Sequence, residues 1–69
     1  MIRVYDINGR THYLALENIQ RISEMGPNSA GIRAIVKLAD GDLLEAFTEA
    51  EAINAQIEKE LAARASKEG

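Results

Sequence analysis

The strongest constraint on the fold is a pair of glycine turns that separate alternating apolar and polar runs. Asn8-Gly9 lies between "IRVYDI" and "RTHYLAL", and Asp40-Gly41 lies between "GIRAIVKLA" and "DLLEAF". Both dipeptides are favoured in type I′ turns, because Asn, Asp and Gly tolerate the positive φ that these turns need at both central positions. A period of two is typical of strands with one buried face. The sequence therefore predicts two β-hairpins with two-residue turns.

The segment between the hairpins fits two structures. Ile19 and Ile22 are three residues apart, which suits one turn of helix as well as a strand. We interpret Glu17-Asn18 as a tight corner, "IQRISEM" as a middle strand and "GPNSA" as a loop, because Gly26-Pro27 stops any regular element. The sheet then has four to five antiparallel strands in roughly sequential order. Its clearest inward-facing residues are Ile32, Ala34, Val36 and Leu38.

A change of period after Phe47 predicts a helix. Thr48 and Glu51 have the spacing of a capping box, which starts a helix near Glu49. An apolar stripe that should face the sheet follows at Ile53, Ile57 and Leu61. We therefore predict an α+β fold, in which a small antiparallel β-sheet, a meander of hairpins, has one C-terminal α-helix packed on it. Residues 1–66 form the single domain, and residues 67–69 form a frayed tail.

Composition narrows the class of protein. The chain has 69 residues, which bury only a thin core, and it has no cysteine. The net charge is −3, with five basic and three acidic side chains in residues 1–38 but three basic and eight acidic ones in residues 39–69. Because the basic side chains are spread singly among few aromatics, nucleic-acid binding is not favoured. No apolar run approaches the roughly 18 residues of a membrane span, and "MIRVYD" lacks a signal-peptide core. We expect a cytoplasmic protein without membrane insertion.

Candidate catalytic and ligand-binding residues are few. An enzyme would have to pair His12, the single imidazole, with Asp6 or Glu17 beside a pocket, whereas a histidine on the solvent face of an edge hairpin is the commoner case. Calcium needs about six to eight oxygen ligands, more than a two-residue turn provides from Asp40, Asp42 and Glu45. The helix acids fit a solvated face, and the alternatives are that they mimic a nucleic-acid backbone or dock a basic partner; they are Glu49, Glu51, Glu58 and Glu60. We therefore predict a protein that is not an enzyme, with no catalytic residue, cofactor or metal.

An apolar surplus on the strands predicts self-association. Leu44, Ala46 and Ile35 have the parity opposite to their inward-facing neighbours, as does Tyr5, so one helix cannot cover them all. We therefore predict a non-enzymatic protein–protein interaction module that forms a homo-oligomer and binds a protein partner. Its candidate partner surface consists of Tyr5, Ile7, Tyr13, Ile35 and Leu44. The alternative, a nucleic-acid-binding regulator, requires one face of the sheet to gather Arg3, Arg10, Arg21 and Arg33.

The order of these features resembles that of the FlbD-like swarming-motility proteins of bacteria. The matching features span about residues 1–62 and comprise the Asn8-Gly9 turn, Leu16, Ile19, Ile22, Gly41 and the helix start at Thr48. The resemblance implies a non-enzymatic accessory role in flagellar motility, exerted through protein contacts, and it brings no catalytic residues. The middle connection "EMGPNSAGIRA" is longer than in that family, and an Ala- and Glu-rich tail replaces a more basic end. Small phage and prophage proteins share this layout, so a phage or prophage regulator that binds a host protein or nucleic acid is the alternative.

Overall fold

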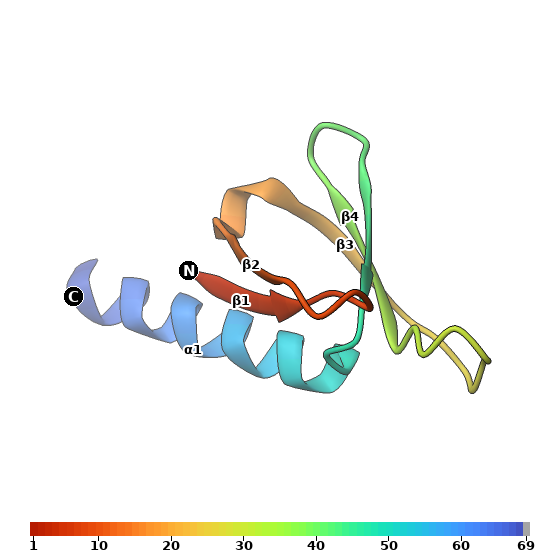
Figure 1. The fold of residues 1–69 in the computed structure, drawn as a ribbon. Coiled ribbons are helices and arrows are strands. Elements are labelled where there is room, and N and C mark those ends of the chain that lie inside the picture. The colour runs from red at the N-terminus through yellow and green to blue at the C-terminus, as the bar shows by residue number, and fades with distance from the viewer. Residues whose placement is uncertain (69) are drawn as a thin grey trace.

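The computed structural model describes residues 1–68, and Gly69 lies outside the described residues. Two antiparallel sheets and one C-terminal helix packed on them form the domain (Figure 1), which confirms the predicted α+β fold. In chain order the elements are β1 (Ile2–Tyr5), β2 (Thr11–Leu14), a 3₁₀ helix (Leu16–Asn18), β3 (Ile19–Glu24), β4 (Ala34–Leu38), β5 (Leu43–Ala46) and α1 (Ala50–Glu68). The predicted corner and middle strand are both present. Because Gly69 is not described, the frayed tail at 67–69 stays a prediction.

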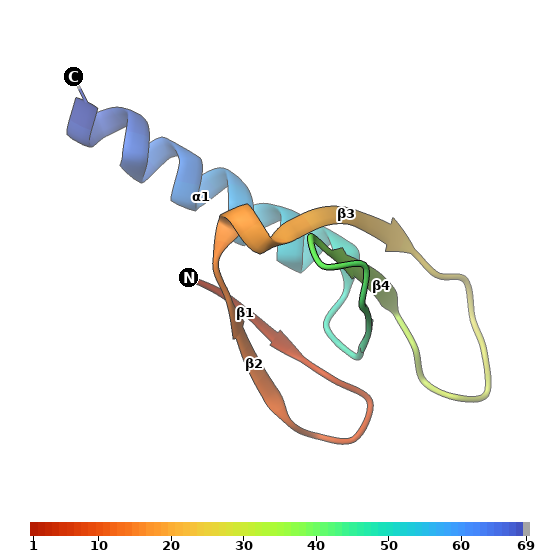
Figure 2. The same ribbon diagram turned by 90° about the horizontal axis from the view of Figure 1, so that it is seen from above.

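The strands form two sheets where the sequence predicted one. β1 pairs with β2, while β3, β4 and β5 pair in that order, and every pairing is antiparallel. The break falls between β2 and β3, where the 3₁₀ helix turns the chain into the second sheet (Figure 2). An isolated bridge between Asp6 and Ala46 joins the end of β1 to the end of β5. Both hairpins are therefore confirmed, but the continuous sequential sheet is wrong.

Both hairpin turns are one residue longer than predicted. Gly9 N–H donates to the Asp6 carbonyl at 3.1 Å, and Asp6 N–H donates to the Arg10 carbonyl at 2.9 Å. In the second hairpin Gly41 N–H donates to the Leu38 carbonyl at 2.9 Å in the same way. Gly9 and Gly41 have φ of 85° and 94°, but the residues before them do not have positive φ. Each turn is thus a type I turn followed by a glycine bulge, and the predicted type I′ geometry is wrong.

The extra turn residue shifts the register of the second hairpin by one position. Val36 lies opposite Leu44, and Lys37 lies opposite Leu43, whereas a two-residue turn would have paired Lys37 with Leu44. Because side chains alternate along a strand, this shift exchanges the two faces of β5. Leu44 packs against the core, Ala46 is fully buried, and Leu43 is 64% exposed. The outward placement predicted for Leu44 and Ala46 is therefore wrong.

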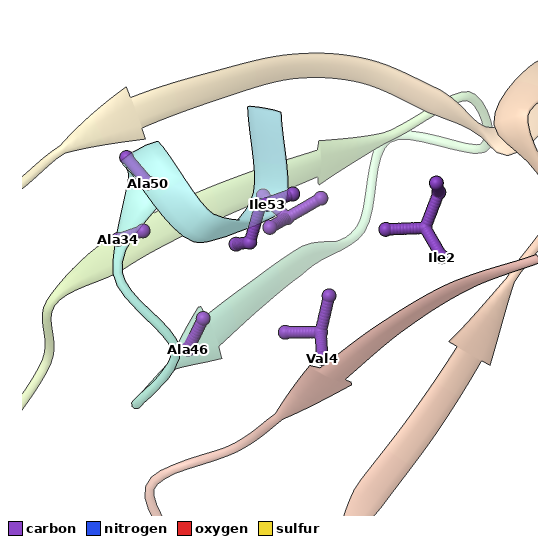
Figure 3. Close-up of a cluster of buried hydrophobic side chains, with 7 residues drawn as sticks. Ile2, Val4, Ala34, Ala46, Ala50 and Ile53 are labelled. Atoms are coloured by element: carbon purple, nitrogen blue, oxygen red, sulfur yellow. The ribbon is translucent and has the colours of Figure 1, made fainter. Parts of the chain in front are cut away.

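The core lies between the two sheets and the first turns of α1 (Figure 3). Its buried hydrophobic residues are aliphatic throughout: Ile2, Val4, Ala34, Val36, Ala46, Ala50 and Ile53. The three alanines have short side chains, which allow the start of α1 to come close to the strands. Ile53 points from α1 into the space between the sheets (Figure 3). The inward face predicted for β4 is confirmed at Ala34 and Val36, which are fully buried.

The helix is longer than the surface it covers. Ile57 packs against the core, but Leu61 is 52% exposed, so the predicted apolar stripe ends one turn early. The C-terminal part of α1 projects past the sheets (Figure 1). The helix begins at Ala50, close to the predicted start. The Thr48 hydroxyl accepts the backbone N–H of Tyr5 at 2.9 Å, which ties the helix start to β1. Across residues 1–68, α1 included, no helix has the apolar length that a membrane crossing requires.

The connection between β3 and β4 is a loop, as predicted, and one amide side chain organises it. Asn28 Oδ1 accepts the backbone N–H groups of Ala30 and Ile32, at 3.1 Å each. Its Nδ2 group donates to the carbonyls of Gly26 and Ile32. These four bonds replace the backbone pairing that the loop lacks. The two ends of the loop are joined where the Met25 N–H donates to the Arg33 carbonyl at 3.1 Å, and the Arg33 N–H donates to the Ala46 carbonyl of β5 at 2.8 Å.

Candidate functional site

All three aromatic side chains of the chain lie on its surface. Tyr5, Tyr13 and Phe47 are 41%, 65% and 51% exposed, and none of them belongs to the buried core. Aromatic rings bury more apolar area than other side chains, so a small domain gains most from them inside. Protein-binding surfaces, in contrast, are enriched in Tyr, Phe, Met and Arg. We therefore define the candidate site from the positions of these three rings.

β1 and β2 place two of the rings beside an arginine. Arg3 pairs with Tyr13 across the hairpin. The Arg3 guanidinium lies over the Tyr5 ring, 5.6 Å from its centroid. The alternation of β1 explains this arrangement, because Ile2 and Val4 point into the core while the residues between and after them point outward. At an exposed site, a guanidinium over a ring gains about 0.5–1 kcal/mol.

The third ring continues the same surface. Phe47 N–H donates to the Tyr5 carbonyl at 2.7 Å, which fixes Phe47 beside the end of β1. The Arg33 guanidinium lies 4.8 Å from the centroid of the Phe47 ring, and its Nη1 is 2.8 Å from Glu49 Oε1. Met25, which is 39% exposed, donates its N–H to the Arg33 carbonyl. We call this surface the aromatic–arginine band; it consists of Tyr13, Arg3, Tyr5, Phe47, Arg33 and Met25.

The five residues predicted as a partner surface divide into three groups. Tyr5 and Tyr13 lie outside the core, as predicted, and belong to the band. Ile35 is partly buried opposite Glu45, and Ile7 is partly buried where its N–H donates to the Glu45 carbonyl at 3.3 Å. Leu44 is the correction, because the register shift turns it toward the core. The binding role of the exposed members stays a prediction.

Two band residues, Phe47 and Met25, were not predicted from the sequence. Phe47 follows Leu43 and Glu45 at alternate positions, and the corrected register makes that the outward parity of β5. A pattern search that allowed a three-residue turn would have found it. Arg33 and Met25 meet because the loop between β3 and β4 closes on itself, and no spacing in the sequence indicates that contact. The contacts of the band that depend on loop closure could therefore not be predicted from the sequence.

The four arginines of the alternative prediction are gathered only in part. Arg3 and Arg33 lie in the band, each against an aromatic ring. Arg21 lies opposite Lys37 on the second sheet, and Arg10 belongs to the first turn. Glu49 forms an ion pair with Arg33 and lowers the positive charge of the band. The basic side chains thus extend over both sheets and the turn.

His12 and Asp6 meet, and the contact belongs to the first hairpin turn. His12 lies opposite Val4, a core residue, and its side chain is 35% exposed, so it lies at the solvent-accessible rim of the inward face. Its Nε2 is 2.7 Å from Asp6 Oδ2, while Asp6 Oδ1 accepts the N–H groups of Asn8 and Arg10 at 2.9 Å each. The hydrogen bond from His12, followed by that from the Arg10 N–H, lowers the pKa of the buried Asp6 carboxyl. Both carboxylate oxygens of Asp6 therefore stabilise the turn.

The other acidic candidates have partners away from His12. Glu17 forms an ion pair with Arg64 of α1, and that hydrogen bond lowers the pKa of the Glu17 carboxyl and raises that of the Arg64 guanidinium. Asp40 Oδ1 accepts the Asp42 N–H at 3.0 Å within the second turn. In the part of the chain that the structure describes, no three acidic or histidine side chains are grouped so as to hold a metal ion. The turn acids therefore have structural roles.

Comparisons with known proteins do not identify a family for this chain. No protein-family model matches the chain, and no curated protein or solved structure matches it. The resemblance to the FlbD-like proteins therefore stays a prediction. The aromatic–arginine band is the feature of the structure that most needs a functional explanation.

Proposed function

We propose that this chain is a non-enzymatic, self-associating protein-interaction module and that the aromatic–arginine band is its docking surface. The exposure of all three aromatic side chains carries the proposal. Tyr, Trp and Arg are the residues on which the binding free energy of protein interfaces concentrates. Arg3, Tyr5 and Tyr13 lie on paired strands, so their backbone is ordered before a partner arrives. Such ordering lowers the entropy lost on binding.

The chemistry of the band suits contact with protein. Arg33 has its charge balanced by Glu49, and Arg3 lies over a ring, so the band offers apolar surface with few unbalanced charges. In a two-fold dimer the same residues of both copies meet, which allows the rings of one copy to cover those of the other. Loss of one central ring from such an interface costs about 2 kcal/mol of binding free energy, or about 30-fold in affinity.

Sedimentation equilibrium of the purified chain tests this proposal. We expect the wild type to form oligomers at micromolar concentration and the Tyr5→Thr/Phe47→Ser double variant to dissociate at least about 30-fold more readily. The matched control is Leu61→Ala, which removes an exposed apolar side chain outside the band and should associate like the wild type. A wild type that stays monomeric, or a double variant that associates equally well, contradicts the proposal. Thermal melts establish that each variant is folded.

The resemblance to the FlbD-like proteins supports a more specific proposal, an accessory role in flagellar motility in the cytoplasm. In the native host, deletion of the chain should then reduce swarming. Complementation with the wild type or Leu61→Ala should restore it, while the Tyr5→Thr/Phe47→Ser variant should not. Swarming that is unaffected by the deletion would contradict this role and would leave the self-association result unchanged.

A second candidate function is binding of single-stranded nucleic acid, as in a phage or prophage regulator. The observation in its favour is that Arg3 and Arg33 alternate with aromatic rings along the band, because bases stack on such rings while arginines contact phosphates. Fluorescence anisotropy with labelled oligothymidine and oligouridine tests it. Binding that weakens with salt and with Tyr5→Thr would support this function, and no binding at low salt excludes it.

A further inference from the structure

A groove runs between β3 and α1 and shares no residue with the aromatic–arginine band. It has a volume of about 700 Å³ and is lined by Ile22, Glu24, Ala50, Glu51, Asn54, Ala55 and Glu58. The two β3 residues occupy alternate positions, which place their side chains on one face of the strand. Glu51, Asn54, Ala55 and Glu58 have the spacing of one helix face. We call this space the β3–α1 groove; it lies between the last residues of β3 and the first half of α1.

One wall of the β3–α1 groove is a strand with a free edge. β3 has six residues and lies at the end of the three-stranded sheet, where it pairs with β4 on one side. Within residues 1–68 no strand pairs with its other side. A free edge presents backbone N–H and C=O groups, and an extended segment can add to it as a further strand. The β3 edge therefore favours an extended polypeptide as the occupant.

The charges that line the groove indicate which charge its occupant carries. Glu24, Glu51 and Glu58 are exposed carboxylates, and no lysine or arginine is among the lining residues. In the described part of the chain, none of the three belongs to an ion pair. Three like charges along one groove attract a cationic segment and repel an anionic one such as a nucleic acid.

We infer that the β3–α1 groove binds an extended basic segment of a partner protein, which adds to the edge of β3. Alternate side chains of an added strand point the same way at a spacing of about 7 Å. Glu51 and Glu58 are seven residues apart on α1, which corresponds to about 10 Å along the helix. Lysine or arginine at alternate positions therefore reaches both carboxylates, and the residues between them point to the opposite face of the sheet.

The probe for this inference is a fluorescein-labelled octapeptide of alternating lysine and valine, titrated with the full chain and followed by anisotropy. We expect saturable binding that the Glu51→Gln/Glu58→Gln variant weakens about fivefold or more. Asp42→Asn/Glu45→Gln removes the same charge outside the groove and should bind like the wild type. Equal binding by the groove variant and the wild type overturns the inference, as does an alternating glutamate–valine octapeptide that binds equally well.

Two further measurements refine this test. One distinguishes strand addition from attraction by charge alone, and the other distinguishes binding in the groove from binding to the band. The same peptide with N-methyl groups at alternate valines keeps its charge but lacks the N–H groups that pair with β3, so it should bind at least about tenfold more weakly. Equal affinity of the methylated peptide overturns strand addition. Tyr5→Thr/Tyr13→Thr should keep the peptide affinity of the wild type; if that variant alone loses it, the peptide occupies the band and the inference is wrong, while the proposed function stands.

Discussion

Among single residues, Asp6 connects the first turn to the rest of the domain. Its side chain accepts two backbone N–H groups and contacts His12, and its backbone bridges to Ala46 of the second sheet. The sequence predicted a type I′ turn with positive φ at both Asn8 and Gly9. Asn8 does not have positive φ, and only Gly9, at the bulge, does. Aspartate is favoured at the first position of a type I turn. Asp6 therefore indicated a turn that starts one residue before the predicted one.

Acid unfolding tests the role of Asp6. Its pKa is lowered in the folded protein, so its carboxylate contributes stability above the pKa of about 3.9 that aspartate has in the unfolded chain. That contribution is lost as the pH falls through the lower pKa of the folded state. Because asparagine does not titrate, we expect the stability advantage of the wild type over Asp6→Asn to shrink between pH 5 and about 2. Urea unfolding across that range measures it, and parallel stability curves would contradict the role.

Substitution of the two bulge glycines by alanine tests the turn geometry, and Gly26 provides the control. Gly9→Ala and Gly41→Ala should each lower the free energy of unfolding by about 1–2 kcal/mol, because both positions have φ near 90°. No atom lies within 4 Å of a Cβ added at either position, so the cost is purely one of backbone conformation. Gly26 is equally open but lacks positive φ, and Gly26→Ala should be neutral or slightly stabilising. Denaturant melts would contradict this account if all three variants were equally stable.

At the scale of elements, the hairpins, corner, loop and helix all follow from sequence patterns, and the errors have two origins, the type of the hairpin turns and the corner between the two sheets. Alternation and glycine turns locate β1, β2, β4 and β5, but the turn type sets which face of each strand is inward. One additional turn residue moved Leu44 into the core and Leu43 out of it. The break between the two sheets depends on the angle of the 3₁₀ corner, which no local pattern encodes.

The helix is expected to contribute stability mainly through its first half. Ile53 is fully buried, so Ile53→Ala should lower the free energy of unfolding by about 2–5 kcal/mol. Leu61 has the same helix-face spacing but is half exposed, and Leu61→Ala should change it by less than about 0.5 kcal/mol. Thermal or urea denaturation of the two variants compares these values directly. Equal losses would mean that the projecting part of α1 packs against another surface, contrary to the fold described.

At the scale of the whole molecule, the fold class was predictable, and the candidate surfaces were predictable only in part. The band depends on Phe47 reaching Tyr5 and on the loop that brings Met25 to Arg33, which are contacts between distant parts of the sequence. The β3–α1 groove depends equally on the placement of α1 beside β3. This small domain thus has two surfaces of different chemistry, the aromatic–arginine band and the acidic β3–α1 groove. We propose that the band binds a second copy of the chain and that the groove binds an extended basic segment.

Concentration-dependent NMR of the ¹⁵N-labelled chain tests the central claim, association through the aromatic–arginine band, most directly. As the protein concentration rises from about ten micromolar to about one millimolar, the amide signals of Tyr5, Tyr13, Arg33 and Phe47 should shift together along one binding curve, while those of the projecting part of α1 should not move. This pattern would place the interface on the band without any substitution. Unchanged band signals across the series, or shifts confined to α1, would contradict the claim.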